Sequence, residues 1–120
     1  IEFLGNRTHK ELSSIFKKAD IFLFASSCET FGITLLEGMA AGMTIACSDK
    51  SSLPEVLNDT GEYFDPGNVD SITNALTYLF ENPDRRFKLA QKAKQRSEQF
   101  TWQQASLDTF RYLTNISNKN

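Results

Sequence analysis

The sequence predicts an α/β fold in which a parallel β-sheet lies between layers of helices. Two observations lead to this prediction. Short apolar runs alternate along the chain with longer segments of helical periodicity, as they do in βαβ units. One run, Ile21–Phe24, is apolar at every position, which is typical of a strand that helices cover on both faces. The 120 residues, of which 40% are hydrophobic, suit a single domain over residues 1–120.

The first part of the chain is predicted to form a strand, a helix and a second strand. Ile1–Leu4 is a short apolar run that ends at Gly5. Thr8 and Glu11 have the spacing of a capping box, which predicts a helix that begins after Thr8. Ile21–Phe24 follows as the second strand and, by its composition, the most buried one. The apolar stripe of the helix is Leu12, Ile15 and Phe16.

The middle of the chain is predicted to alternate loops, helices and strands. A polar loop, Ala25–Phe31, leads into a helix over Gly32–Ala41, and Gly42 stands where a helix C-cap belongs. Thr44–Ser48 is the third strand, and Ser52–Leu57 is predicted to make one helical turn.

The second half of the chain adds a fourth short strand, Glu62–Phe64, and then only helices. Asn68 or Asp70 caps one helix. The Asn82-Pro83 pair begins another that runs to about Gln99, because proline suits the first position of a helix. The prediction is a Rossmann-like, three-layer unit with about four parallel strands. The inner stripe of the first of these helices is Ile72, Leu76, Leu79 and Phe80.

A last helix is predicted from Thr101, which fits a capping box with Gln104, to about Ile116. It forms a helical C-terminal extension, and Ser117–Asn120 is predicted to be a polar, frayed tail. Its inner face is predicted to consist of Leu107, Phe110, Leu113 and Thr114.

Composition excludes several classes of protein. Thirteen basic and fifteen acidic residues give a net charge of −2, so the chain has no overall basic field for nucleic acid. No apolar run approaches the roughly 18 residues of a membrane span. Two cysteines, Cys28 and Cys47, are too few for a disulfide framework and indicate a reducing, cytoplasmic compartment. The chain begins without Met in an apolar stretch, so we expect a piece of a longer protein.

The loop that ends at Gly32 is a candidate phosphate site. It is small and polar, and a helix begins immediately after it. The start of a helix leaves N–H groups unpaired and carries a partial positive charge, both of which favour an anion. Gly32 has no Cβ, so an anion could approach its backbone closely. The alternative is an ordinary loop.

Glu37 is the only ionisable residue between positions 32 and 43. Its carboxylate has two acceptor oxygens, which suit the paired 2′- and 3′-hydroxyls of a ribose. The alternative is a solvent-facing glutamate on an amphipathic helix. The small or polar residues that share its stripe of the helix, and that would let a polyol approach, are Thr34, Gly38 and Ala41.

Glu29 lies eight residues earlier, in the loop itself, within reach of a ligand at the helix start. The alternative for Glu29 is a surface acid or a capping residue. The single histidine, His9, is predicted to be a surface residue of the first helix.

The segment SSCETFGITLLEGMAAG, residues 26–42, resembles the E-x7-E motif of retaining glycosyltransferases of glycosyltransferase family 4. The resemblance covers about residues 1–104 and implies the C-terminal, donor-binding part of the two-domain GT-B architecture. Other stretches agree in the same order: Phe3–Gly5, Glu11–Phe24, Leu53–Val56, Gly61–Pro66 and Phe100–Trp102.

The resemblance implies a role for each motif residue. Glu37 would hold the ribose hydroxyls, and Glu29, the candidate catalytic residue, would contact hydroxyls of the donor sugar. Fixed N–H dipoles at the helix start would stabilise the negative charge that grows on the leaving diphosphate. No metal or other cofactor is expected. The groups implied to face the diphosphate are the backbone of Phe31, Gly32 and Ile33 and the hydroxyl of Thr34.

The implied reaction is transfer of a sugar, with retention, from a UDP- or GDP-sugar donor to a saccharide or lipid-linked acceptor. The implied setting is surface polysaccharide biosynthesis of the O-antigen or capsule type. The acceptor site and the basic residues that grip the phosphates would lie in an absent N-terminal domain and other missing units. We therefore expect this chain to bind donor weakly and to be inactive alone. The last helix, about residues 101–117, would pack on the absent domain.

The sequence departs from the family pattern at a few positions. Gly38 stands where many members have Ala, and Thr44 stands where many have Pro. Ser51 and Ser52 replace a stretch that is frequently rich in glycine. Two alternatives to a glycosyltransferase remain open: a non-catalytic sugar-nucleotide-binding module and a plain α/β interaction domain.

Two segments of the chain could contact further partners. In the Rossmann-like order, two strands that this chain lacks would normally separate Ile1–Leu4 from Ile21–Phe24. Ile1–Leu4 must then pair directly with Ile21–Phe24, or it must pair with another chain in an edge-strand dimer. The basic helix from Asn82 either contacts anionic lipid at the inner face of the membrane or presents a solvated face with Leu89 and Ala93 inward.

Overall fold

The computed structural model describes residues 1–117, and the predicted tail residues 118–120 lie outside this range. It contains a parallel three-stranded sheet in the order β1-β2-β3. The α/β prediction is confirmed, with three strands in place of about four. The strands are β1 (Ile21–Phe24), β2 (Thr44–Ser48) and β3 (Glu62–Phe64). The helices are α1 (His9–Phe16), α2 (Ile33–Ala40), α3 (Leu53–Leu57), α4 (Val69–Glu81), α5 (Pro83–Ser97) and α6 (Trp102–Ser117).

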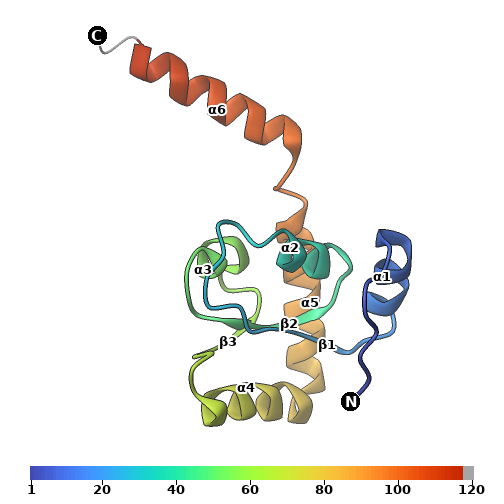
Figure 1. Ribbon diagram of the computed structural model, residues 1–120. Helices are drawn as coiled ribbons and strands as arrows, with labels where there is room; N and C mark the ends of the chain where they lie inside the picture. Colours follow the sequence, from blue (N-terminus) through green and yellow to red (C-terminus); the bar gives the residue numbers. More distant parts are fainter. Residues whose placement is uncertain (118–120) are drawn as a thin grey trace.

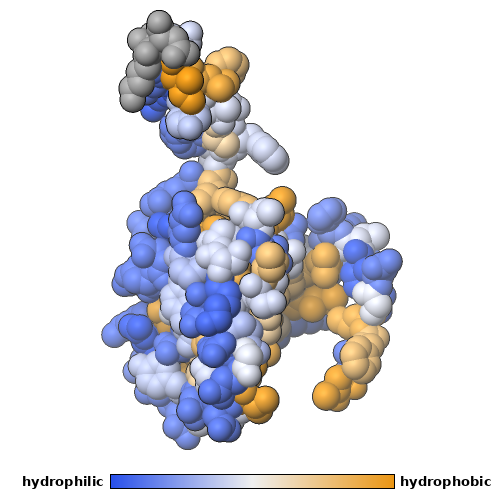
Figure 2. All heavy atoms as spheres, turned by 60° about the vertical axis from the view of Figure 1, so that its left-hand side comes forward, coloured by the Kyte–Doolittle hydropathy of each residue, from blue (hydrophilic) through white to orange (hydrophobic). Residues whose placement is uncertain are grey.

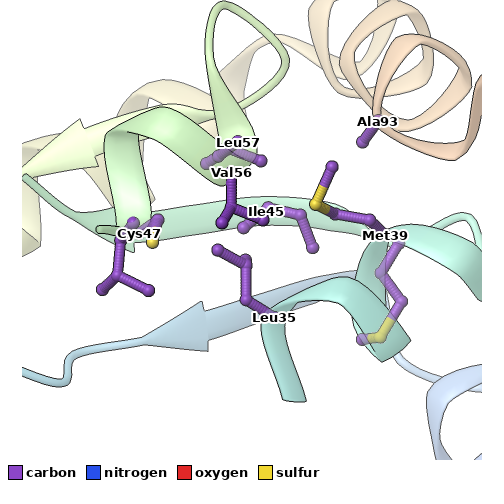
Figure 3. Packing of buried hydrophobic residues seen from close by; sticks show 9 residues of the cluster. Leu35, Met39, Ile45, Cys47, Val56, Leu57 and Ala93 are labelled. Atoms are coloured by element: carbon purple, nitrogen blue, oxygen red, sulfur yellow. The ribbon is translucent and has the colours of Figure 1, made fainter. Parts of the chain in front are cut away.

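Helices cover both faces of the sheet, with α2 and α3 on one side and α4 on the other (Figure 1). The side chains of β2 alternate between these faces, as strand geometry requires. Ile45 and Cys47 belong to a core cluster with residues of α2 and α3, whereas Ala46 belongs to a cluster with residues of α4. Helix α5 contributes to both clusters through Ala93 and Leu89. Figure 3 shows the first cluster around Ile45.

The most buried strand is β2 and not, as predicted, β1. All five residues of β2 are buried, whereas Leu23 of β1 is 43% exposed and its neighbours are partly exposed. The reason is the position in the sheet, since β1 pairs only with β2 and forms an edge. Its apolar composition suits an interior strand, but within residues 1–117 no second neighbour covers it.

The predicted strand at Ile1–Leu4 is wrong for this chain. These residues have no regular secondary structure, and Ile1 and Phe3 are almost fully exposed. A strand needs a neighbour for its backbone hydrogen bonds. None of the ladders among residues 1–117 includes Ile1–Leu4, so the expected pairing with β1 does not occur. Pairing with another chain stays a prediction.

Local capping signals place the helix ends where they are predicted. Thr8 and Glu11 form the capping box at the start of α1, with Thr8 N donating to Glu11 Oε2 over 2.9 Å. These hydrogen bonds from Thr8 lower the pKa of Glu11. Asn68, rather than Asp70, caps α4 with its side-chain oxygen. Gly42 follows α2 with φ of 77°, as a C-terminal glycine should.

Helix α6 projects from the body of the molecule (Figure 1) and has no buried residue. The predicted inner face is therefore exposed here, with Phe110 72% and Leu113 56% accessible. Figure 2 shows apolar side chains exposed on this helix. The radius of gyration, 16.4 Å, exceeds the roughly 13.6 Å expected for a compact chain of this length. The amphipathic pattern correctly predicts a helix, but no described element lies against its apolar face.

Candidate functional site

The candidate site lies at the edge of the sheet where the parallel strands end. The loop after β1 and the loop after β2 emerge at this edge, because parallel strands end on the same side. The two loops are bonded to each other through Glu29 and Ser51. Helix α2 begins here and lies between α3 and α1 (Figure 1).

The first turn of α2 is uncapped, as predicted for an anion site, although Gly32 itself is buried. Gly32 is its N-cap, and no side chain caps the first turn. The N–H groups of that turn therefore lack a side-chain partner and retain the partial positive charge of a helix start. Ile33 is 64% exposed and Thr34 is also exposed, so solvent reaches this turn.

Gly32 is required for a different reason from the one predicted. Its φ is 90°, in the left-handed region, where a side chain is strained. A Cβ at this position would lie 2.9 Å from Leu53 Cδ2. The side of Gly32 that a Cβ would fill is thus occupied by the protein's own leucine. Glycine is needed so that α3 packs against the loop, whether or not an anion also approaches.

Glu37 faces a groove between α1 and α2. Its side chain is 37% exposed, and its Oε1 lies 3.5 Å from Nδ1 of His9. The groove has a volume of about 440 Å³. Figure 2 shows a hollow between α1 and the body of the molecule. The side chains that line the groove include His9, Lys17, Glu37 and Lys94, which are charged or ionisable, and Leu12, Phe16, Ala40 and Ala41, which are apolar.

The stripe predicted around Glu37 is only partly correct. Thr34 is exposed and Ala41 lines the groove, but Gly38 is buried. A Cβ on Gly38 would lie 2.7 Å from Cδ1 of Phe22. Gly38 therefore faces the sheet, where it leaves room for an aromatic ring of β1, and does not offer an opening to a polyol.

Glu29 is half-buried, and its backbone is held by the loop after β2. Its N–H donates to Ser51 Oγ over 3.2 Å, and its carbonyl accepts from the hydroxyls of Ser51 at 2.6 Å and Ser52 at 3.1 Å. Glu29 therefore lies on the α3 side of the helix start, whereas Glu37 faces α1. The Glu29 backbone and the Glu37 side chain thus lie on different sides of α2, the first beside the loop before α3 and the second beside α1.

The side chain of Phe31 packs against Phe100, a residue outside its own loop. Its ring lies 5.7 Å from that of Phe100 in an edge-to-face arrangement. Arg96 lies over the same Phe100 ring, 5.5 Å from its centre. These contacts tie the loop before α2 to the end of α5, so the Phe31 side chain has a packing role, while its backbone stays a candidate for the diphosphate.

Sequence reasoning missed two contributions to this region. His9 is a surface residue as predicted, 93% exposed, but it lies beside Glu37. Ser51 and Ser52 are noted in the sequence only as departures from a pattern, whereas they hold the backbone of Glu29. The contact of the serines with the loop after β1 could have been predicted, because neighbouring strands of a parallel sheet bring the loops that follow them together.

Three charged residues near this edge pair with one another. Lys50 Nζ lies 2.9 Å from Asp49 Oδ1 and 3.5 Å from Asp65 Oδ1, and the hydrogen bond to Asp49 is the main reason why the pKa of Lys50 is raised. Among residues 1–117, no three His, Cys, Asp or Glu side chains form a group that could hold a metal ion. The expectation that no metal is used stays a prediction.

Two of the basic residues of α5 make contacts within the chain. Lys92 binds Asp59 over 3.1 Å, and Arg96 donates to the carbonyls of Val56 and Glu55. Leu89 and Ala93 face inward, as the solvated-face alternative predicts. Over residues 1–117, the structure contains no helix with the length and apolarity needed to cross a bilayer.

Comparison with known proteins matches residues 1–96 to the family described as glycosyl transferases group 1. O-antigen chain mannosyltransferase B of Escherichia coli is 30% identical over 109 residues, which cover 91% of this chain and 29% of that protein. The chain thus spans less than a third of this relative.

Two solved structures show the same fold. Sucrose-phosphate synthase of Thermosynechococcus elongatus superposes with a TM-score of 0.83 at 21% identity, over 99% of this chain and 31% of that one. The C-terminal domain of a glycosyl transferase group 1 family protein of Francisella tularensis gives a TM-score of 0.67 at 28% identity, over 80% of this chain and 49% of that one.

Proposed function

This chain belongs to the glycosyl transferases group 1, and on that premise we propose that it is the nucleotide-sugar-binding part of a retaining glycosyltransferase. The observation that carries the proposal is the accessible carboxylate of Glu37, 37% exposed in a groove along the second half of α2, a helix whose first turn has no side-chain cap. A carboxylate that can accept from ribose hydroxyls and an uncapped helix start that favours an anion then lie on one helix.

The proposed role of each group follows from its chemistry. Glu37 accepts hydrogen bonds from the 2′- and 3′-hydroxyls of the ribose. The backbone N–H groups of the first turn of α2 and the hydroxyl of Thr34 face the diphosphate. As the bond to the sugar breaks, negative charge grows on the diphosphate, and these fixed dipoles stabilise the transition state more than the ground state. Glu29 contacts the sugar and helps to orient it. No metal takes part.

The proposed reaction is transfer from a UDP- or GDP-sugar to a saccharide or lipid-linked acceptor. The relative from Escherichia coli is an O-antigen chain mannosyltransferase, and this similarity supports a role in surface polysaccharide assembly. Such a role places the protein in the cytoplasm, with peripheral contact at the inner face of the membrane when the acceptor is lipid-linked.

The chain covers only 29% of the relative's length, which supports the proposal that an N-terminal domain supplies the acceptor site. The exposed apolar face of α6 is proposed to pack on that domain. In its absence, the open edge of β1 is proposed to allow dimers of the chain. Donor binding by the chain alone is then weak, and transfer by the chain alone is negligible.

Titration of the chain with UDP, GDP and their sugars, followed by amide chemical shifts, tests the proposal. We expect shifts at residues 31–34 and around Glu37. Glu37→Ala should weaken binding at least about tenfold, which corresponds to about 1.4 kcal/mol. Glu81→Ala is the matched control, because Glu81 is an exposed glutamate at the end of α4, on the other face of the sheet.

Absence of any nucleotide-dependent shift would favour the plain interaction domain and refute the proposal. Equal losses in the Glu37 and Glu81 variants would refute the assignment of Glu37. Binding without transfer, measured on the full-length protein with a mixed acceptor set, would favour a non-catalytic binding module.

A further inference from the structure

The backbone of Glu29 is clamped by two serine hydroxyls from a different loop. The Ser51 hydroxyl accepts from the Glu29 N–H and donates to the Glu29 carbonyl, and the Ser52 hydroxyl donates to the same carbonyl. These contacts join residues 22 and 23 positions apart in the sequence. We call Ser51 and Ser52 the serine clamp. Both polar backbone groups of a single residue are thus bound by side chains that come from outside its loop.

Each serine of the clamp adopts a locally unfavourable arrangement to make these bonds. Ser51 has φ of 59°, in the left-handed region that favours glycine or asparagine. Ser52 is the N-cap of α3, where a serine side chain usually accepts from the helix's own N–H groups, but it makes no such bond. Its hydroxyl bonds Glu29 instead. Ser51 thus has a strained backbone, and Ser52 does not cap its own helix. Locally unfavourable features of this kind are often found at functional sites.

The two loops also interlock through apolar packing. Leu53, which follows the clamp, fills the space beside Gly32, where a Cβ would lie 2.9 Å from its Cδ2. The loop before α2 is therefore held at Glu29 by hydrogen bonds and at Gly32 by a buried leucine. The Glu29 side chain departs from a backbone that cannot rotate freely, which narrows the directions that its carboxylate can take.

We propose that Ser51 and Ser52 are positioning residues that aim the Glu29 carboxylate at the sugar of the bound donor. This inference rests on the proposed function and goes beyond it, because it assigns the serine clamp to recognition of the sugar and leaves the nucleotide to α2. Loss of the clamp then weakens binding of a nucleotide sugar and leaves binding of the corresponding nucleoside diphosphate unchanged.

The variants distinguish the effect of the serine hydroxyls on sugar binding from the effect of the backbone conformation of the loop. Ser51→Gly removes the hydroxyl and relieves the left-handed strain, so a purely conformational requirement would be met by this variant. Ser52→Ala removes the second hydroxyl, and Ser52→Thr restores one at a residue whose φ of −78° accepts a β-branched side chain. Affinities for UDP, GDP and their sugars are measured on each variant, together with amide hydrogen exchange at Glu29.

We expect faster exchange at the Glu29 amide in Ser51→Gly. We also expect about three- to tenfold weaker binding of the nucleotide sugar in Ser51→Gly and Ser52→Ala, with recovery in Ser52→Thr and unchanged binding of the diphosphate in all three. Equal weakening for diphosphate and nucleotide sugar, or no weakening of either, would overturn the inference. A wild-type chain that binds no nucleotide at all would overturn the proposed function, and this inference with it. Normal sugar binding in Ser51→Gly would overturn the inference alone.

Discussion

Replacement of Gly38 by alanine tests how closely α2 lies on the sheet. A Cβ at this position would lie 2.7 Å from Cδ1 and 3.1 Å from Cε1 of Phe22, both inside normal contact distances. The Phe22 ring cannot turn away easily, because it packs on Phe16 at 5.4 Å and on Phe24 at 5.7 Å between ring centres. The added methyl therefore forces α2 away from the sheet or the ring out of its stack.

Two effects of opposite sign set the size of the change. Overpacking of a core typically costs about 1–3 kcal/mol. Alanine in a helix interior is favoured over glycine by about 1 kcal/mol. The cost of overpacking equals or exceeds the gain in helix propensity. We therefore expect Gly38→Ala to lower the free energy of unfolding by up to about 2 kcal/mol. Urea denaturation of the chain, followed by far-UV circular dichroism, measures this quantity.

Two controls separate the effects. Ala40→Gly, at the exposed last position of the same helix, should cost less than the roughly 1 kcal/mol of a helix interior and gives a lower bound on the propensity difference. Phe22→Leu should relieve the clash, so that Gly38→Ala becomes neutral or stabilising in that background, with a coupling energy of about 1–2 kcal/mol. If Gly38→Ala stabilises the wild-type chain, the ring moves freely and the reasoning from the close contact is refuted.

The remaining predictions concern α5 and the core cysteine. Arg96 donates over 2.6 Å to the carbonyls of both Val56 and Glu55 at the end of α3, so Arg96→Ala should lower the free energy of unfolding by about 2 kcal/mol, and Arg96→Lys should recover at most half. The exposed Lys88 of the same helix is the control, and an equal effect of Lys88→Ala would contradict this assignment. Burial raises the pKa of the Cys47 thiol to about 12, so iodoacetamide at pH 8 should modify the exposed Cys28 and spare Cys47, and two adducts formed at equal rates would be inconsistent with the buried thiol. Because the folded-state pKa of Cys47 is raised, its contribution to stability is present below its ordinary pKa of 9.0 and should be lost as the pH rises toward 12, as alkaline unfolding curves would show.

The helix ends could be predicted from local sequence. The Thr8–Glu11 capping box, the glycine after α2 and the asparagine before α4 mark helix ends within one residue. Such signals depend on atoms a few positions apart, so the sequence contains all the information they need. The position of Glu37 on the side of α2 opposite the buried Leu35 and Met39 follows from helical periodicity in the same way.

Pairings across the sequence could not be predicted in this way. The apolar run of Ile1–Leu4 resembles a strand, but a strand exists only where a neighbour completes its hydrogen bonds. The same argument explains β1, whose composition suits an interior strand although it lies at an edge. For Gly38, periodicity alone does not say that the ring of Phe22 occupies the space beside it.

The sequence by itself determined the alternation of strands and helices, the ends of the helices and the presence of two glutamates around the start of α2. Only the tertiary structure decided that the serine clamp holds Glu29, that His9 lies beside Glu37, and that the apolar face of α6 is exposed. The physical reason is the range of the interactions. Helix caps and helical periodicity depend on residues within one or two turns of each other. Packing and strand pairing bring together residues that are far apart in the sequence, and the sequence pattern does not show which of these residues will be in contact.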